Sequence, residues 1–384
     1  MAKYEIKDGI AIIPKGTQEI EDRAFAGCKE LTSVTIPDSV TEIGDSAFFG
    51  CSALTSVTIP NSVTKIGERA FLGCSALMEI KVAEGNPKYD SRKNCNAIIE
   101  TARNKLIVGC KSTNIPDSVT EIEEWAFSEC SGLSSVVIPD SVTKIGEGAF
   151  AGCYRLTSVT IPDSVTEIEE WAFSECYGLT SVVIPDSVTK IGDSAFLWCM
   201  SLSSVTIPDS VTEIGEVAFL RCSALTEIKV AEGNPKYDSR KNCNAIIETA
   251  CNKLIVGCKS TNIPDSVTEI GEKAFLGCSG LTSVTIPDSV TEIGRGAFFG
   301  CSALTSVVIP DSVTEIGEGA FSECDSLETI TLGPNIDKIH TEVFSSCSAL
   351  KTIFVPAKKT DYYKKRLPEN LHSLIVELEP IKKQ

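Results

Sequence analysis

Residues 31–53 read LTSVTIPDSVTEIGDSAFFGCSA, and this stretch decides the fold because the chain repeats it. The Phe of the Ala-Phe pair marks each copy, and in the last copy Val343 replaces the Ala. The marker residues are Phe25, Phe48, Phe71, Phe127, Phe150, Phe173, Phe196, Phe219, Phe275, Phe298, Phe321 and Phe344. Nine intervals between neighbouring markers are 23 residues long, and two are 56. A short fixed period predicts one structural unit per repeat, stacked on its neighbours into a solenoid.

Within one copy, residues 33–36 alternate polar and apolar, which predicts a short strand with its Val and Ile side chains inward. Pro37 ends this strand, and residues 38–39 favour a turn. Residues 44–48 are mostly small and predict a single helical or 3₁₀ turn. The strands are expected to stack into one parallel sheet that lines the concave face, with the helical turns on the convex side.

Composition narrows the classes of partner. The chain has 384 residues, 42% hydrophobic content and a net charge of −17, so nucleic acid and anionic membranes are not expected partners. No apolar run is long enough for a membrane span. Residues 1–9 lack the apolar core of a signal peptide. Either the chain stays in the cytoplasm, or a leader lies outside it.

Twelve of the 17 cysteines follow the marker Phe by three residues. They are Cys28, Cys51, Cys74, Cys130, Cys153, Cys176, Cys199, Cys222, Cys278, Cys301, Cys324 and Cys347. In stacked coils their Cβ atoms run parallel at about 4.8 Å, whereas a disulfide needs converging vectors and about 3.8 Å. We therefore expect buried thiols that act as small hydrophobic residues. Some disulfides, and less readily a metal, remain alternatives, although no CxxC pair occurs.

The pattern LxxLxIPxxVxxIxxxAFxxC resembles the BspA-like, or Treponema pallidum type, leucine-rich repeat over roughly residues 10–356. The resemblance implies an α/β solenoid that is right-handed and curved. The continuous repeat itself predicts a single domain over residues 1–384, with repeats at 14–356 between an N-terminal cap at 1–13 and a C-terminal cap at 357–384. The resemblance also implies a bacterial surface protein that mediates adhesion to host matrix proteins or to other cells.

Two nearly identical insertions, near residues 83–115 and 231–263, account for the two long intervals. In each, an apolar run, a polar turn and a second apolar run predict a protruding β-hairpin. Residues 74–122 and 222–270 differ at two positions only, where Met78 and Arg103 correspond to Thr226 and Cys251. This indicates recent duplication. Twelve marked copies and two insertion coils predict about fourteen coils.

Motifs for chemistry are absent from the sequence. The only histidines are His340 and His372, and no GxSxG, Walker or GxGxxG motif occurs. His340 replaces a repeat Gly and is expected to be a surface side chain. The chain is therefore expected not to be an enzyme, and no catalytic residue, cofactor or metal site is predicted.

One candidate binding surface is the concave face. Its outward side chains are predicted to be a regular polar array that includes Ser33, Thr35, Ser56, Thr58, Ser158, Thr160, Ser204 and Thr206. Leucine-rich repeat proteins usually bind partners there. The alternative is that Ser and Thr simply suit exposed strands.

A second candidate surface arises where large side chains replace small or polar ones between the two insertions. These residues are Trp125, Tyr154, Trp171, Tyr177, Trp198 and Met200. Large apolar residues gathered on one flank favour a partner-binding site. The alternative is that they pack over the turns of adjacent coils and add only stability.

These observations predict a non-enzymatic scaffold that binds a protein. The resemblance implies that this partner is an extracellular matrix protein or a surface protein of another cell. The resemblance also places the scaffold at the cell surface or outside the cell. Two other functions stay open, namely a structural spacer and a carbohydrate binder that uses the aromatic flank. The sequence predicts no oligomeric state.

Overall fold

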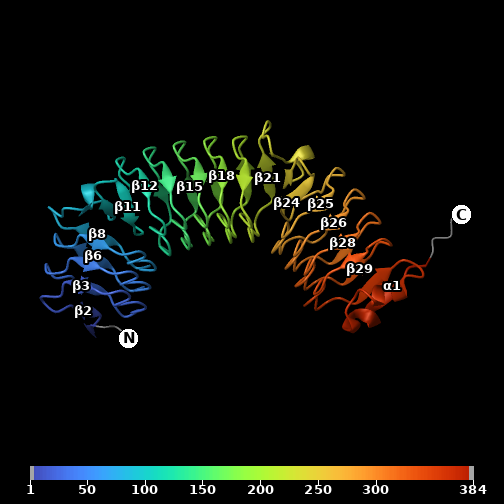
Figure 1. The fold of residues 1–384 in the computed structure, drawn as a ribbon, viewed down its shortest axis with the longest axis horizontal. Coiled ribbons are helices and arrows are strands. Elements are labelled where there is room, and N and C mark those ends of the chain that lie inside the picture. Colours follow the sequence, from blue (N-terminus) through green and yellow to red (C-terminus); the bar gives the residue numbers. More distant parts are fainter. Residues whose placement is uncertain (1–3, 380–384) are drawn as a thin grey trace. The chain divides into compact units, whose positions relative to one another are not determined.

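The computed structural model describes residues 4–379. The chain winds as a solenoid of parallel strands with about 16 turns. It divides into two compact units (Figure 1). Unit 1 runs to Met200 and includes Glu213–Phe219, and unit 2 comprises Ser201–Thr212 and the chain from Leu220 onward. The prediction of one repeat domain is not tested by this division and stays a prediction.

The predicted Ser-Val-Thr strands form a first parallel ladder, in which the Val side chain is buried in most copies, such as Val34, Val57 and Val159, and the following Thr faces outward. In unit 1, Val57 pairs with Ile80, 23 residues on, so the register equals the sequence period. The strands of unit 1 are β2 (Ile10–Ile12), β4 (Ser33–Thr35), β6 (Ser56–Ile59), β8 (Glu79–Val82), β13 (Val136–Val137), β15 (Ser158–Thr160) and β17 (Ser181–Val183). Those of unit 2 are β19 (Ser204–Ile207), β21 (Glu227–Val230), β27 (Ser306–Val308), β29 (Thr329–Thr331), β31 (Thr352–Val355) and β32 (Ile375–Glu377).

The prediction of a single sheet was wrong, because the Glu-Ile or Lys-Ile pair of each repeat forms a second parallel ladder. Ile43 is fully buried and pairs in register with Ile20 and Ile66. The strands of unit 1 are β3 (Glu19–Ile20), β5 (Glu42–Ile43), β7 (Lys65–Ile66), β12 (Glu121–Ile122), β14 (Lys144–Ile145), β16 (Glu167–Ile168), β18 (Lys190–Ile191) and β20 (Glu213–Ile214). Those of unit 2 are β25 (Glu269–Ile270), β26 (Glu292–Ile293), β28 (Glu315–Ile316) and β30 (Lys338–Ile339).

The segment around each marker Phe, predicted to be helical, is instead a series of linked turns, which we call the turn stack. Ser46 has a φ of 54°, which interrupts the right-handed helical conformation. The N–H groups of Ser46, Phe48 and Gly50 donate to carbonyls of the next coil at 2.9, 2.8 and 2.8 Å. Alternate residues thus bond between coils, as in a parallel sheet, and a helix would have used those groups internally.

The core runs through the turn stack as a column of marker rings. Phe48 stacks on Phe25 and Phe71 with ring centroids 5.0 and 5.1 Å apart. The repeat cysteines line the same core, and the Sγ of Cys51 donates to the carbonyl of Phe25 at 3.1 Å. Ten of the twelve are buried, and Cys278 and Cys347 are half-buried. The predicted core position of these thiols is therefore confirmed.

The first insertion contains β9 (Tyr89–Asp90), η1 (Arg92–Asn94), β10 (Ile98–Glu100) and β11 (Lys105–Val108). β10 and β11 pair antiparallel, which confirms the predicted hairpin. The hairpin does not simply protrude, because β11 also pairs in parallel with β12 and so belongs to the second ladder. The second copy contains β22 (Tyr237–Asp238), η2 (Arg240–Asn242), β23 (Ala245–Glu248) and β24 (Lys253–Gly257).

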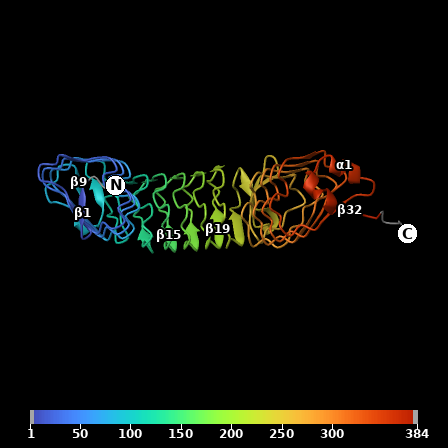
Figure 2. The same cartoon turned by 90° about the horizontal axis from the view of Figure 1, so that it is seen from below.

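The solenoid has about 16 turns, two more than the fourteen predicted, and its end strands depart from the repeat. In unit 1, β1 (Glu5–Lys7) pairs antiparallel with β2, which joins the first ladder through β4. In unit 2, β32 joins the same kind of ladder through β31. It lies beside α1 (Thr360–Lys364), which is followed by η3 (Glu369–Leu374) (Figure 2). Within residues 4–379, no helix has the length and apolar character needed to cross a membrane.

Candidate functional site

All six residues of the predicted aromatic flank lie in unit 1, but the repeat positions they occupy separate them into two groups. Trp125 and Trp171 stand two residues before the marker Phe, where φ is positive in every marked copy. Tyr154, Tyr177 and Met200 follow the repeat Cys. Trp198 directly precedes Cys199 and also has a positive φ, of 61°.

The two tryptophans form a row with Arg69. Their ring centroids are 5.8 Å apart, although a whole coil lies between them. That coil carries Gly148, where an added Cβ would lie 2.3 Å from the Trp125 ring. The guanidinium carbon of Arg69 lies 5.0 Å from the centroid of the Trp125 ring. Both tryptophans are half-buried, so these contacts favour the packing alternative for this pair.

Tyr154, Tyr177 and Met200 form an exposed ridge on three successive coils. We call these three residues the tyrosine ridge. The rings of Tyr154 and Tyr177 stack at 4.9 Å with an interplanar angle of 14°. Tyr154, Tyr177 and Met200 are 39, 37 and 42% exposed. Burial of part of the ring, and a 3.0 Å hydrogen bond to Glu175, raise the pKa of Tyr177 to about 12. The phenol therefore stays neutral and donates that hydrogen bond at physiological pH.

The structure places the predicted Ser/Thr array on the outward side of the first ladder. Thr35, Thr58, Thr160 and Thr206 are exposed. The partner Ser residues are half-buried except for Ser158, which is exposed. Ser204 and Thr206 belong to unit 2, and the other six residues belong to unit 1. Whether this array binds a partner stays a prediction.

The sequence analysis missed three exposed valines in the same ladder. Val137, Val183 and Val308 are 81, 62 and 62% exposed, and each stands where other copies have Thr. In unit 1, Val137 and Val183 flank Thr160 on adjacent strands. The signal was the change from Ser-Val-Thr to Ser-Val-Val. The segment 154–183 thus contains both tyrosines of the ridge and the exposed Val183.

Carboxylates line the turn stack beside the tryptophan row. Glu124, Glu147 and Glu170 occupy equivalent positions on three successive coils. Burial, followed by repulsion from Glu124 and Glu170, raises the pKa of Glu147, while Arg69 opposes the change. The surface beside the tryptophan row therefore has three carboxylates near one cation, the guanidinium of Arg69.

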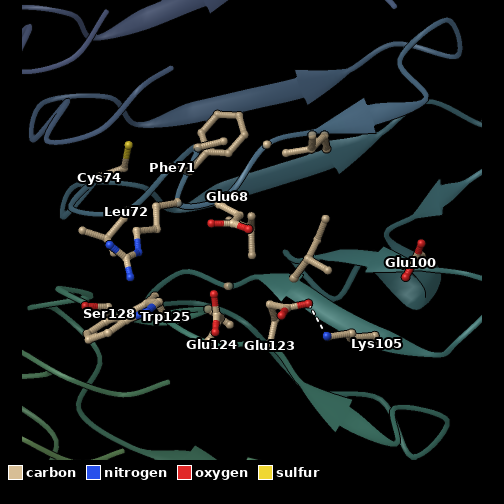
Figure 3. A pocket seen from close by; sticks show the side chains of 18 of the residues that line it. Glu68, Phe71, Leu72, Cys74, Glu100, Lys105, Glu123, Glu124, Trp125 and Ser128 are labelled. Carbon is tan, nitrogen blue, oxygen red and sulfur yellow. Dashed lines mark ion pairs between the residues drawn. The ribbon is translucent and has the colours of Figure 1, made fainter. Parts of the chain in front are cut away.

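The turn stack of unit 1 is interrupted at the first insertion. Residues 105–110 run from the second ladder directly to Cys110, without an Ala-Phe turn. A cavity of about 360 Å³, which we call the turn gap, lies between the turn around Phe71 and the turn around Phe127. Figure 3 shows Phe71, Leu72 and Glu68 on one side and Glu124, Trp125 and Ser128 on the other.

Charged groups surround one end of the turn gap. The Lys105 ammonium pairs with Glu121 at 3.2 Å and with Glu123 at 2.5 Å, the second of which is dashed in Figure 3. Glu100 lies 3.8 Å from Lys88 and 3.9 Å from Arg103. The absence of Ala-Phe from the insertion was the sequence signal for this cavity.

The two histidines make ordinary surface contacts. His340 Nε2 lies 2.8 Å from Glu315 Oε1, and His372 Nε2 lies 3.0 Å from the carbonyl of Leu367. In the described part of the chain, no three His, Cys, Asp or Glu side chains are grouped to hold a metal ion.

The repeat pattern matches a known family model. The model described as "BspA type Leucine rich repeat region (6 copies)" matches residues 9–105, 104–226 and 245–367. Among curated proteins, no sequence matches the chain.

Solved structures with similar folds include two bacterial leucine-rich repeat proteins. One is a leucine rich cell surface protein from Faecalibacterium prausnitzii, with 32% identity and a TM-score of 0.61. That alignment covers 89% of this chain and 84% of the other. The second is a leucine-rich repeat protein from Bacteroides ovatus, with 26% identity and a TM-score of 0.51, and it covers 97% and 94% of the two chains.

Proposed function

The chain belongs to the BspA-type leucine-rich repeat family, and from that membership we propose that it is a non-enzymatic scaffold that binds a protein partner. The similarity to a leucine rich cell surface protein supports a place at the bacterial surface. We further propose that the partner is an extracellular matrix protein or a surface protein of another cell, so that the scaffold mediates adhesion.

The observation that carries this proposal is the tyrosine ridge of unit 1. Stacked tyrosines with two rotatable side-chain bonds bury large areas at small entropic cost, and aromatic residues dominate binding energy at protein interfaces. Other copies, such as those with Ser52, Ser75 and Ser131, carry Ser at the same position. The fold therefore does not need the large side chains there.

The test replaces Tyr154, Tyr177 and Met200 together by the Ser of the other copies. Wild type and variant are applied to arrays of purified matrix proteins and of glycans, and affinities are measured by interferometry. We expect wild type to bind a protein on the array and the triple variant to bind it at least tenfold more weakly. The melting temperature should change by less than about 4 °C, the shift that roughly 1 kcal/mol produces in a chain of more than 150 residues.

A matched control replaces Trp125 and Trp171 by Ser, because these residues contact each other and Trp125 also contacts Arg69. Loss of binding in this variant with the ridge variant unaffected would place the partner site on the tryptophan row. Binding to glycans alone would favour the carbohydrate alternative. Binding to neither array would favour the structural spacer, and equal binding by all variants would contradict a role for either aromatic group.

A further inference from the structure

The segment that contains α1, at the end of unit 2 (Figure 1), has a concentration of positive charge that is unusual for this acidic chain. Residues 358–366 read KKTDYYKKR, so five cations stand against one carboxylate and the segment has a net charge of +4. No other nine-residue segment of the chain reaches this value. Because the whole chain has a net charge of −17, the remainder without this +4 carries −21.

The lysines of this segment are not neutralised by the fold. Those that form no ion pair within residues 4–379 are Lys358, Lys359, Lys364 and Lys365. Three of them are exposed and Lys359 is half-buried. Lysines of the repeats commonly pair across coils, as Lys190 does with Glu213 at 3.0 Å. The four ammonium groups of the segment are therefore available to an external anion.

The ring of Tyr362 holds two of the five cations close together. The Lys359 ammonium lies 4.3 Å from the centroid of this ring, and the guanidinium carbon of Arg366 lies 3.6 Å from it. The two charges are therefore no more than 7.9 Å apart, the sum of these distances. The ring is fixed on the preceding coil, because its hydroxyl donates to the carbonyl of Ile336 at 2.9 Å. Two like charges held this close repel each other, and an anion in contact with both offsets that repulsion.

The carboxylates near the segment make hydrogen bonds to other groups. Asp337 accepts the hydroxyl of Tyr362 at 3.1 Å. Glu377 accepts the main-chain N–H and the hydroxyl of Thr360 at 3.2 and 2.7 Å, and these bonds lower its pKa. Asp361 is the one carboxylate within the segment, and it is exposed. These three carboxylates weaken the positive potential of the five cations but do not cancel it.

The chemistry of this surface favours a flexible polyanion that has neither bases nor an apolar surface. Lysine ammonium groups are point charges on flexible stems, so they can contact repeated anionic groups without a fixed register. Single-stranded nucleic acid needs open aromatic faces for base stacking, whereas the ring of Tyr362 is already in contact with two cations. A bilayer needs apolar side chains that insert, whereas Tyr363 of α1 is fully buried and the exposed residues of this helix are Asp361 and Lys364.

We propose that residues 358–366 bind a sulfated polysaccharide. Sulfate groups repeated along the polymer contact the three exposed lysines of the segment. One sulfate approaches Lys359 and the Nη2 of Arg366, whose Nε and Nη1 already donate to main-chain carbonyls. The acidic remainder of the chain repels the rest of the polymer, so contact is confined to this segment. The proposal depends neither on the tyrosine ridge nor on a role in adhesion.

The test measures binding of the full chain to immobilised dextran sulfate by interferometry. The test variant combines Lys358→Gln, Lys359→Gln, Lys364→Gln and Lys365→Gln. The matched control replaces four lysines that form ion pairs, namely Lys65, Lys81, Lys190 and Lys229, so that both variants have a net charge of −21.

We expect the test variant to bind at least about tenfold more weakly than wild type, and the control to bind within about threefold of it, because only the unpaired lysines face the polymer. The wild-type affinity should fall steeply between about 50 and 200 mM salt, because bound counterions are released. Equal weakening of the two variants would mean that binding follows net charge alone. That result, or no binding of wild type at the lower salt concentration, would overturn the proposal.

Further probes separate the sulfated polysaccharide from other ligands. Unsulfated dextran should not bind, and poly-glutamate, oligothymidine and vesicles that contain phosphatidylserine should each bind at least about tenfold more weakly than dextran sulfate. Tighter binding of any of these probes, if the test variant loses it, would assign the surface to that class of ligand and overturn the proposal. Arg at the same four positions keeps the charge and should preserve binding to dextran sulfate. Circular dichroism checks that each variant folds, and if the fourfold variant does not, Lys364→Gln with Lys365→Gln decides the outcome.

Discussion

The residue two positions before the marker Phe adopts a left-handed backbone conformation in every marked copy. Copies use Arg23, Ser46, Trp125 or Gly148 there, although only Gly adopts this conformation without steric cost. The hydrogen bonds that alternate N–H groups of the turn make to the next coil offset the steric cost of this backbone conformation. Side chains at this position therefore differ freely in size, and their contacts depend on the neighbouring copies.

Gly148 offers the sharpest test of those contacts. Gly148→Ala should destabilise unit 1 by about 2–4 kcal/mol, combining about 1–2 for a left-handed Ala with about 1–3 for forcing the Trp125 ring away. Gly296→Ala is the control, because Gly296 has the same φ of 56° but its nearest neighbour atom is 3.7 Å away. Chemical denaturation followed by circular dichroism measures both. Equal losses in the two variants would contradict the close packing of Trp125 over Gly148.

Thiol reactivity should separate one cysteine from the other sixteen. Cys251 is exposed, whereas burial raises the pKa of Cys51 to about 12. Partial burial, then a hydrogen bond with Glu248, also raises the pKa of Cys251, so its thiolate is scarce at pH 8 and its labelling rate should rise about tenfold per pH unit. Mass spectrometry should find one rapid label per native chain and 17 after denaturation.

The control for this labelling is Cys251→Arg, the residue found at the equivalent Arg103 of the first insertion. This variant should lose the rapid label, leaving only slow reaction at half-buried Cys278 and Cys347. Rapid labelling of several repeat cysteines would mean that the turn stack opens readily. Recovery of disulfide-linked repeat cysteines would contradict the free thiols.

At the scale of elements, the column of marker rings should contribute most to stability. Phe173 is fully buried and stacks between Phe150 and Phe196 at 5.4 and 5.6 Å. Phe173→Ala should cost about 3–5 kcal/mol through the cavity it leaves. Phe49→Ala, at a side chain that is 41% exposed, should cost about 1 kcal/mol or less. Urea unfolding of unit 1 measures both, and a loss below about 1 kcal/mol for Phe173→Ala would show that the column is not the core.

The elements that sequence alone predicted were those with a strong pattern. The Ser-Val-Thr strands alternate over four residues, and the marker Phe and repeat Cys recur without exception, so their burial could be predicted. The second ladder was missed because a two-residue strand such as Glu42–Ile43 is too short to show alternation. The turns around Phe48 were taken for helices because Ser46 gives no sign of its positive φ.

The candidate surfaces could be predicted from the sequence only in part, because a sequence does not show in which direction each side chain points. Substitutions against the consensus identified Trp125, Tyr154 and Tyr177 correctly as departures. Their division into a packed row and an exposed ridge depends on side-chain directions, and on Gly148 leaving space for one indole. The turn gap follows from a deletion, the missing Ala-Phe pair in the insertion, which a search for matching residues does not detect.

At the scale of the whole molecule, the near-identity of residues 74–122 and 222–270, which lie 148 positions apart, predicts that copies can be removed without loss of folding. Deletion of residues 75–222 joins Cys74 to Ser223 and preserves the local sequence Cys-Ser-Ala-Leu at the junction. In a solenoid each coil contacts only its neighbours, so the remaining coils keep their pairing and register. The shortened chain should therefore remain folded, with the circular dichroism spectrum per residue unchanged.

Denaturant unfolding gives the quantitative form of this prediction. The slope of unfolding free energy against urea scales with the surface exposed, so it should fall to roughly 0.6 of its original value, in proportion to chain length. The control deletes residues 80–227 instead, which joins Glu79 to Ile228 and again preserves the local sequence. Both deletions should behave alike, because each removes one full period of the duplication. A shortened chain that binds hydrophobic dyes and loses its cooperative transition would mean that the coils depend on contacts beyond their neighbours, and the array could then not have grown by simple duplication.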